Sequence, residues 1–408
     1  MTAVVVVVFV ATYLLIATRR LAWLPIGRSA GALLGAAAMV AIGALTPAQS
    51  FAAIDHGTIL LLFSMMLLMV YLERGGLFDR LVAGALVLAR TPAQLLVLVS
   101  LLAALLSAFL VNDAVCLLLT PVVVTLGVRA RLPLTPYLLA ICTSANIGSA
   151  ATLVGNPQNM IIGGLSGLGF AEFLALAGPP AAIGVGINTL LLWLFYRRSL
   201  PATLLPAAEA SAQRRDPLVM PVLVLVAAGF LVGLDLGYTA LAGALVFVIR
   251  DRKPPESAIA RIDWGLLVFF CGLFVVVQGL ASTGLVDRAW AAAVPRDLGT
   301  PAALAGFAGL LAAGSNLVSN VPMVLLAGPE VAGYADPRMA WVALALATTV
   351  AGNLTLLGSV ANIIVAEQAA PQHELGFFEY LRFGVVSTAI VLPAVIAALW
   401  IELRWLGM

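Results

Sequence analysis

Long apolar stretches without a charged residue run through the whole sequence, and two of them are too long for a single membrane helix. The 40 residues 132–171 and the 32 residues 298–329 contain no Asp, Glu, Lys or Arg, whereas a straight span needs about 20 residues. The chain is 62% hydrophobic and 10% charged, compared with roughly 45–50% and about 25% in soluble domains. We conclude that this is a polytopic membrane protein, and that its two longest apolar stretches contain breaks.

The basic residues predict how the chain crosses the bilayer. If 91–128 and 298–329 are re-entrant hairpins, five crossings remain in each half. With the N-terminus outside, 17 of the 21 Lys and Arg residues fall in cytoplasmic segments, as the positive-inside rule requires. We therefore predict ten crossings, two hairpins and both termini outside, in a plasma (inner) membrane.

The second half of the sequence repeats the first. The string 76–80 (GLFDR) recurs as 284–288 (GLVDR) at an offset of 208, and 152–155 (TLVG) recurs as 355–358 (TLLG) at an offset of 203. An odd number of crossings per copy forces the second copy to insert upside down. We predict an all-α protein made of an inverted repeat 1–196 (hairpin 91–128, broken helix 136–162), a cytoplasmic linker 197–216 and a second inverted repeat 217–408 (hairpin 298–329, broken helix 339–366).

Polar residues gather where the apolar stretches are interrupted, at 110–114, 143–159, 315–322 and 352–362. Gly, Asn, Ser and Pro are poor helix-interior residues, and non-helical backbone at membrane depth is stable only when it is buried or lines a wet cavity. A broken helix exposes N–H groups that suit anions and carbonyls that suit cations. Matched interruptions in inverted repeats therefore indicate a transport site near the bilayer midplane, although any one small residue also fits close helix packing.

Asp113 is the strongest single candidate for a functional residue. A carboxylate within an apolar stretch costs about 2.5–3.5 kcal/mol on insertion, and its counterpart in the other repeat is Val321, so the duplication does not account for it. We predict that Asp113 binds and releases a proton, or ligates a sodium ion, during transport. The alternative is a neutral Asp that caps the second hairpin helix.

Several function classes are disfavoured by the sequence. The net charge of +2 and the scattered Arg residues indicate no nucleic-acid partner. The three Cys residues lie far apart in apolar stretches, as small buried hydrophobes do, and we expect no metal site, no cofactor and no catalytic residues. Glu172, Glu379, His56 and His373 fall at span edges or in loops, where a solvated role is expected. An ion channel remains the alternative from a different class, followed distantly by a membrane enzyme.

The interruptions carry a resemblance to a known group of carriers. The segments 112–114 (NDA), 145–159 (ANIGSAATLVGNPQN), 319–322 (SNVP) and 358–362 (GSVAN) resemble the ion transporter superfamily, which includes arsenite and antimonite permeases, citrate transporters, divalent-anion/sodium symporters and sodium/proton antiporters. The resemblance covers nearly the whole chain. It implies an elevator-type carrier that forms a homodimer, in which hairpins and broken helices move against a scaffold of the remaining spans.

Together, the interruptions and the resemblance predict the site residues. Substrate is expected to be bound by Asn112, Asp113, Ser144, Asn146, Asn156, Ser319, Asn320, Asn353 and Ser359. The coupling ion, Na⁺ or H⁺, is expected near Asp113, Gly148, Thr152, Gly155, Asn159, Thr355, Gly358 and Asn362.

The substrate class is left open between two branches of the superfamily. The hairpin tips read 111–113 (VND) and 319–321 (SNV), where dicarboxylate symporters carry Ser-Asn-Thr twice, and an ionised Asp113 would repel a dianion. The Asn-Asp tip resembles the arsenite permeases, whereas the break 155–159 resembles the anion transporters. We predict a secondary transporter of a small anion, oxyanion or neutral oxyacid, coupled to protons or sodium.

Overall fold

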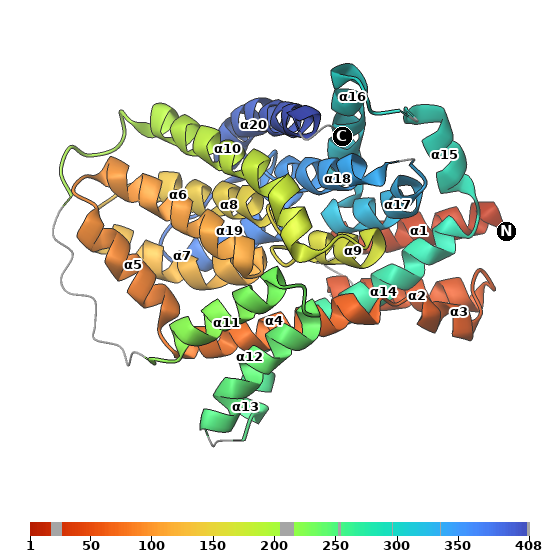
Figure 1. Cartoon of the computed structure of the whole chain (residues 1–408), viewed down its shortest axis with the longest axis horizontal. Coiled ribbons are helices and arrows are strands. Elements are labelled where there is room, and N and C mark those ends of the chain that lie inside the picture. The colour runs from red at the N-terminus through yellow and green to blue at the C-terminus, as the bar shows by residue number, and fades with distance from the viewer. Residues whose placement is uncertain (18–26, 205–215, 252–253, 296, 335, 406–408) are drawn as a thin grey trace.

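The computed structural model describes residues 1–17, 27–204, 216–251, 254–295, 297–334 and 336–405, and all regular structure in these ranges is helical (Figure 1). The first half contains α1 (Thr2–Ala17), α2 (Arg28–Ala41), α3 (Pro47–Ala52), α4 (His56–Arg74), α5 (Leu77–Leu88), α6 (Pro92–Phe109), α7 (Asn112–Arg129), α8 (Leu134–Ser149), α9 (Pro157–Ser166) and α10 (Phe170–Tyr196). Most of the predicted linker, 205–215, lies outside the described residues.

The second half contains a matching series of helices. They are α11 (Val219–Leu231), α12 (Leu236–Asp251), α13 (Glu256–Ile259), α14 (Trp264–Ala281), α15 (Leu285–Ala293), α16 (Pro301–Val318), α17 (Asn320–Ala332), α18 (Pro337–Ala351), the short 3₁₀ turn η1 (Leu356–Gly358), α19 (Val360–Ala369) and α20 (Phe377–Trp405).

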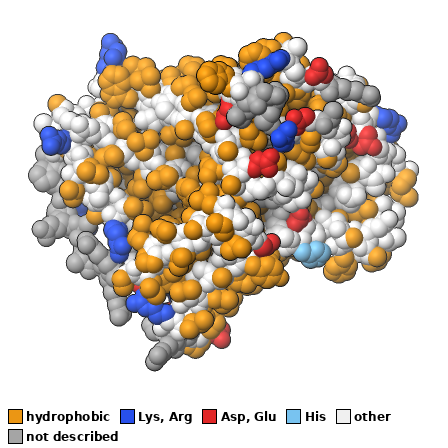
Figure 2. Space-filling model, in the orientation of Figure 1, with side chains coloured by type: hydrophobic (Ala, Val, Ile, Leu, Met, Phe, Trp, Pro, Cys, Tyr) orange, Lys and Arg blue, Asp and Glu red, His pale blue; other side chains and the backbone are white. Residues whose placement is uncertain are grey.

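Several of these helices suit a bilayer. Within the described residues, seven are long and apolar enough to cross a membrane, and five shorter helices are also apolar. Apolar side chains cover much of the middle of the face in Figure 2, while many charged side chains lie toward its edges. The chain is accordingly a multi-pass integral membrane protein. The number of crossings and the side on which each terminus lies stay predictions.

The same local signals start corresponding helices in the two halves. Asp55 caps α4 by accepting a hydrogen bond from the Thr58 N–H at 2.7 Å, and Asp263 caps α14 in the same way. Gly76 and Gly284 precede α5 and α15 with φ values of 74° and 65°, a left-handed conformation that glycine adopts without steric cost. The duplicated strings in the sequence are therefore duplicated helix starts.

Helix packing between the halves is reciprocal. Helix α2 packs on α14 while α12 packs on α4, and α7 packs on α19 while α17 packs on α9. This exchange of partners is the pattern that the predicted two-fold relation between the halves would produce. Helix α8 lies at the centre, where every residue except Thr135 is buried, and it contacts α6, α7, α10 and α19. Inverted insertion and elevator motion stay predictions.

Candidate functional site

The first hairpin tip meets the break in the first broken helix. Helices α6 and α7 are separated by residues 110–111, and α8 and α9 by residues 150–156. The backbone N–H of Asn112 donates to the carbonyl of Gly155 at 2.9 Å, and the Thr152 hydroxyl donates to the carbonyl of Ala108. These two bonds fix the tip of the hairpin against the non-helical backbone of the break.

The side chain of Asn146 connects elements of both halves. Its Nδ2 donates to Oδ1 of Asn353 at 2.9 Å and to Oδ1 of Asn362 at 3.1 Å. Its Oδ1 accepts from Nδ2 of Asn112 and from Oγ of Ser359, both at 3.1 Å. All five side chains are at most 6% exposed. We call these five residues the Asn146 cluster, and it joins the first hairpin tip, α8 and the second break.

The two breaks hold their carbonyls in the same way. Nδ2 of Asn159 donates to the carbonyls of Ser149 and Thr152 at 3.2 and 2.8 Å. Nδ2 of Asn362 donates to the carbonyls at the corresponding positions, Gly352 and Thr355, at 2.8 and 3.1 Å. Carbonyls that a broken helix leaves without intrahelical partners are thus satisfied by an amide from the following half-helix.

The two breaks restart their helices differently. Asn156 precedes Pro157 and accepts a hydrogen bond from the Asn159 N–H at 2.9 Å, which is the favoured order of an N-cap residue followed by proline. The Asn156 Nδ2 donates to Ser149 Oγ at 2.9 Å across the break. At the start of α19 the Ser359 side chain makes no cap bond and instead contacts the Asn146 cluster.

The second hairpin tip is built differently and is more exposed. Ser319 separates α16 from α17 with φ 75° and ψ 161°, a backbone region that is essentially restricted to glycine and stores about 1–3 kcal/mol of strain in other residues. Asn320 accepts from the Ser315 hydroxyl at 2.6 Å. Leu317 is 84% exposed, whereas Leu110 at the first tip is 1% exposed. The second hairpin tip is therefore less enclosed by the rest of the chain than the first.

Asp113 lies beside the Asn146 cluster, in the first turn of α7. Its backbone N–H donates to Oδ1 of the neighbouring Asn112 at 2.9 Å, and Asp113 as a whole is only partly buried. Asp113 is thus linked through its backbone to a member of the Asn146 cluster.

The predicted glycines lie at points of close backbone approach. A Cβ atom added to Gly148 would lie 2.3 Å from the carbonyl oxygen of Ala104 on α6, and one added to Gly155 would lie 2.2 Å from that of Ser149. At Gly358 the corresponding distance, to the Gly352 oxygen, is 2.8 Å. Real Cβ atoms do not approach this closely, so these glycines allow the breaks to close.

Sequence reasoning missed part of the polar network. Asn188 on α10 donates to the hydroxyls of Thr143 and Ser144 at 2.8 and 3.2 Å, and accepts from Ser387 on α20 at 2.7 Å. Asn353 donates to the Thr143 carbonyl at 3.2 Å, which links this group to the Asn146 cluster. The available signal was that Asn188 interrupts an otherwise apolar stretch.

Known proteins resemble this chain over most of its length. Residues 13–351 match the citrate transporter family. The chain belongs to this family. The match confirms the superfamily that the interruptions predicted, and with it a transporter rather than an enzyme.

Individual relatives cover nearly the whole chain. The putative transporter arsB of Dictyostelium discoideum is 31% identical over 90% of this chain and 86% of its own length. The silicon efflux transporter LSI3 of Oryza sativa subsp. japonica is 33% identical over 90% and 91%. This family member is a secondary transporter, as the sequence predicted.

Two solved transporters share the fold. The YdaH transporter of Alcanivorax borkumensis aligns with a TM-score of 0.57 at 16% identity, covering 91% of this chain and 87% of the other. The antimetabolite efflux pump MtrF of Neisseria gonorrhoeae aligns with a TM-score of 0.55 at 14% identity, over 90% and 85%. At these identities the comparison supports the fold alone.

Proposed function

We propose that the chain exports a small neutral oxyacid, of the kind formed by trivalent arsenic or by silicon, in exchange for protons. The observation that carries this proposal is the Asn146 cluster, whose groups are amides and hydroxyls. Each hydroxyl of an oxyacid both donates and accepts, so such a molecule can replace the bonds within the cluster one for one. The names of two relatives, arsB and silicon efflux transporter LSI3, agree with this substrate class.

The charge balance of the site favours a neutral substrate over a dianion. The interruptions at 110–114, 143–159, 315–322 and 352–362 contain Asp113 but no Lys, Arg or His. Each interruption contributes one helix end and one helix start, so the partial charges of the helix termini offset one another. A buried dianion would lack a cationic partner, and leaving a charge unpaired at low dielectric is costly.

We assign ion coupling to a proton on Asp113. At both breaks, an asparagine amide donates to the carbonyls that a sodium ion would need, at Ser149 and Thr152 and at Gly352 and Thr355. Asp113 is the remaining ionisable group at the site, and a carboxylate that is alternately buried and exposed is suited to proton exchange. The proposed cycle loads the oxyacid when Asp113 releases its proton, and releases the oxyacid when Asp113 is protonated.

Carboxylate transport is the second candidate, because the family takes its name from citrate. Proteoliposomes separate the two candidates: one set is loaded with arsenite and another with citrate, and counterflow is measured with and without a pH gradient. We expect saturable arsenite counterflow that persists when choline replaces sodium, and pH-driven arsenite accumulation that a protonophore abolishes. Citrate counterflow would assign the other branch, and unitary currents in a planar bilayer would assign a channel.

Asp113→Asn tests whether Asp113 carries the proton. Asp79→Asn is the matched control, because Asp79 also lies in the first turn of a helix, α5, outside the interruptions. We expect Asp113→Asn to keep arsenite exchange at equal pH but to lose pH-driven accumulation, while Asp79→Asn retains both. Equal pH-driven accumulation in all three proteins would reject the role of Asp113.

The assembly and orientation belong to the same proposal. We infer a homodimer in an inner membrane with both termini outside, on the basis of the family resemblance and the positive-inside bias. Light scattering of the detergent-solubilised protein tests the dimer, and reporter fusions at both ends test the orientation. A monomeric mass, or a cytoplasmic signal from either fusion, would overturn the corresponding part.

A further inference from the structure

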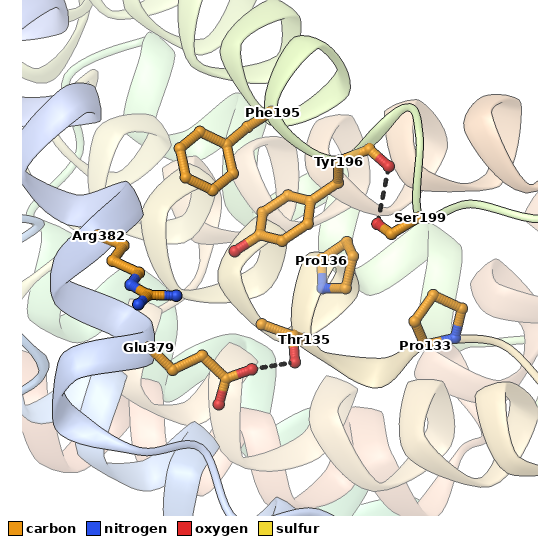
Figure 3. A pocket seen from close by; sticks show the side chains of 8 residues that line it. All are labelled: Pro133, Thr135, Pro136, Phe195, Tyr196, Ser199, Glu379 and Arg382. Carbon is orange, nitrogen blue, oxygen red and sulfur yellow. Dashed lines mark hydrogen bonds between the residues drawn. The ribbon is translucent and has the colours of Figure 1, made fainter.

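A cavity lies away from the Asn146 cluster, where α8 begins, α10 ends and α20 begins. Its volume is about 270 Å³, and its lining includes Thr135, Pro136, Phe195, Tyr196, Glu379 and Arg382 (Figure 3). Along α8, Thr135 precedes Asn146 by eleven residues, which is roughly 16 Å at 1.5 Å per residue. Pockets for drug-sized ligands have volumes of about 300–1,000 Å³, so this cavity suits a smaller polar group.

The cavity presents two opposite charges. The guanidinium of Arg382, the hydroxyl of Tyr196 and the carboxylate of Glu379 point toward the same space in Figure 3. Glu379 and Arg382 are three residues apart on α20, a spacing that places Cβ atoms roughly 5–6 Å apart on one helix face. Among the described residues Arg382 forms no ion pair. Its charge is therefore available to a ligand.

Neighbouring groups hold the Glu379 carboxylate in place. The Thr135 hydroxyl donates its single proton to Glu379 Oε1. Nε2 of His373 lies 3.0 Å from the same hydroxyl oxygen, so this nitrogen must be the donor in that contact. Nε2 of His373 is also 3.8 Å from Glu379 Oε1. A carboxylate can accept more hydrogen bonds than these, so the Glu379 carboxylate can also accept hydrogen bonds from a cationic ligand.

Exposed aromatic and basic side chains near the cavity indicate that it lies at the level of the lipid headgroups. Trp193 and Phe195 near the end of α10 are 37% and 45% exposed, and Phe378 at the start of α20 is 76% exposed. Arg197 directly follows the last residue of α10, and its guanidinium carbon lies 5.7 Å from the centroid of the Trp193 ring. Exposed aromatic residues followed by basic residues are typical of the boundary between hydrocarbon and water.

We propose that this cavity binds the headgroup of phosphatidylethanolamine. The phosphate pairs with Arg382, and the ammonium donates to Glu379 and lies against the ring of Tyr196. The separation of the two charged side chains on one helix face suits a zwitterion whose charges lie a few ångströms apart. A phosphatidylglycerol headgroup would leave Glu379 without a cation, and the methylated ammonium of phosphatidylcholine has no N–H to donate.

The location of the cavity gives this lipid a role. Helices α8, α10 and α20 also carry Thr143, Asn188 and Ser387, which bond to one another beside the Asn146 cluster. A headgroup that contacts the ends of the same three helices holds them together. We therefore expect phosphatidylethanolamine to stabilise the transport site and to raise the transport rate.

Native mass spectrometry of protein released from vesicles tests the proposal. Vesicles contain equal amounts of phosphatidylethanolamine, phosphatidylglycerol and phosphatidylcholine, and the retained lipids are counted for the wild type, Arg382→Gln, Glu379→Gln and Arg198→Gln. Arg198 is exposed at the same end of α10 but does not line the cavity, so Arg198→Gln controls for loss of surface charge. We expect the wild type and Arg198→Gln to retain phosphatidylethanolamine at least threefold over the other lipids.

The two cavity variants have different expected results. Arg382→Gln loses retention of phosphatidylethanolamine, whereas Glu379→Gln loses only its preference over phosphatidylglycerol. Equal retention of all three lipids by the wild type would overturn the proposal, and so would an equal loss in Arg198→Gln and Arg382→Gln. Full competition by soluble phosphoethanolamine at the same concentration would also overturn it, because the site would then serve a free metabolite.

Because Glu379 also bonds Thr135, folding of each variant is measured separately. The melting temperature in lipid-free detergent identifies any misfolded variant. The rise in melting temperature on adding phosphatidylethanolamine is then compared between the wild type and Arg382→Gln. This variant is chosen because the side chain of Arg382 makes no hydrogen bond within the described residues. A rise in the wild type that is absent from Arg382→Gln supports the site, and an equal rise in both rejects it.

Discussion

Replacing Asn146 by Ala tests whether one side chain holds the candidate site together. The change removes four hydrogen bonds, to Asn112, Asn353, Ser359 and Asn362. Each such bond contributes about 0.5–1.5 kcal/mol net, so four predict a loss of about 2–6 kcal/mol in the free energy of unfolding. The partners are at most 6% exposed, so water can compensate only through the small space that the substitution opens.

The measurement is a denaturant titration in mixed micelles, followed by the fluorescence of the 7 Trp residues. Gln158→Ala is the matched control, because it removes an equally buried amide that makes one hydrogen bond, to Thr349 Oγ1 at 3.1 Å. We expect this control to lose about 0.5–1.5 kcal/mol. A loss in Asn146→Ala no larger than that in Gln158→Ala would refute the four-bond interpretation.

A double-mutant cycle with Asn353→Ala sharpens the test. Residues that share a hydrogen bond show a coupling of about 0.5–3 kcal/mol, whereas independent sites add within roughly 0.3–0.5 kcal/mol. Asn146 and Asn353 come from opposite halves of the chain, so coupling between them reports contact between the halves. If Asn146 also binds substrate through one hydrogen bond, Asn146→Ala weakens substrate affinity by about tenfold for each 1.4 kcal/mol lost. Additive single-mutant effects would contradict the contact.

Three further predictions concern the tips and the breaks. Gly148→Ala is expected to abolish transport and lower the yield of folded protein, because its Cβ would lie 2.3 Å from a backbone oxygen of α6; wild-type transport would contradict the close approach. In a variant without the native cysteines, Leu317→Cys is expected to react with a membrane-impermeant maleimide at least tenfold faster than Leu110→Cys, since the native side chains are 84% and 1% exposed; equal rates would contradict the difference between the tips. Ser319→Gly is expected to stabilise the protein by about 0.5–2 kcal/mol, which is the relieved strain less the entropy cost of glycine; a destabilised variant in the same denaturant titration would show that no strain is stored there.

Elements with local signals are those that the sequence predicted well. An interruption was predicted at Gly155, Asn156 and Pro157, and in the structure Asn156 is the N-cap of α9 and Pro157 lies in its first turn. These signals depend on a few adjacent residues, so they can be read before any tertiary structure is known. The all-helical membrane fold follows from the apolar stretches, and the transporter family was indicated by the resemblance of the interruptions.

Features that depend on helix rotation could not be predicted. Asn188 and Ser387 are single polar residues in apolar helices, and only the packing of α10 on α20 turns them toward each other. Gly148 was predicted near a coupling ion, and the structure places it where α8 approaches the backbone of α6. The cavity at Glu379 was also missed, because Thr135, Tyr196 and Arg382 come from three segments that are far apart in the sequence.

The two halves hold the carbonyls of their breaks in the same way, but they differ in the side chains that face the candidate site. Asn159 and Asn362 hold equivalent carbonyls in the two breaks, so these positions preserve the fold of each repeat. Asn146 corresponds to Thr349, and Asp113 corresponds to Val321, so neither is needed to form a break. Each of these two side chains therefore has a role beyond forming a break: Asn146 makes the contact between the halves, and for Asp113 we propose proton binding. Exchanging the two sides, as in Asp113→Val with Val321→Asp, should therefore preserve the fold and move the titrating group to the second tip.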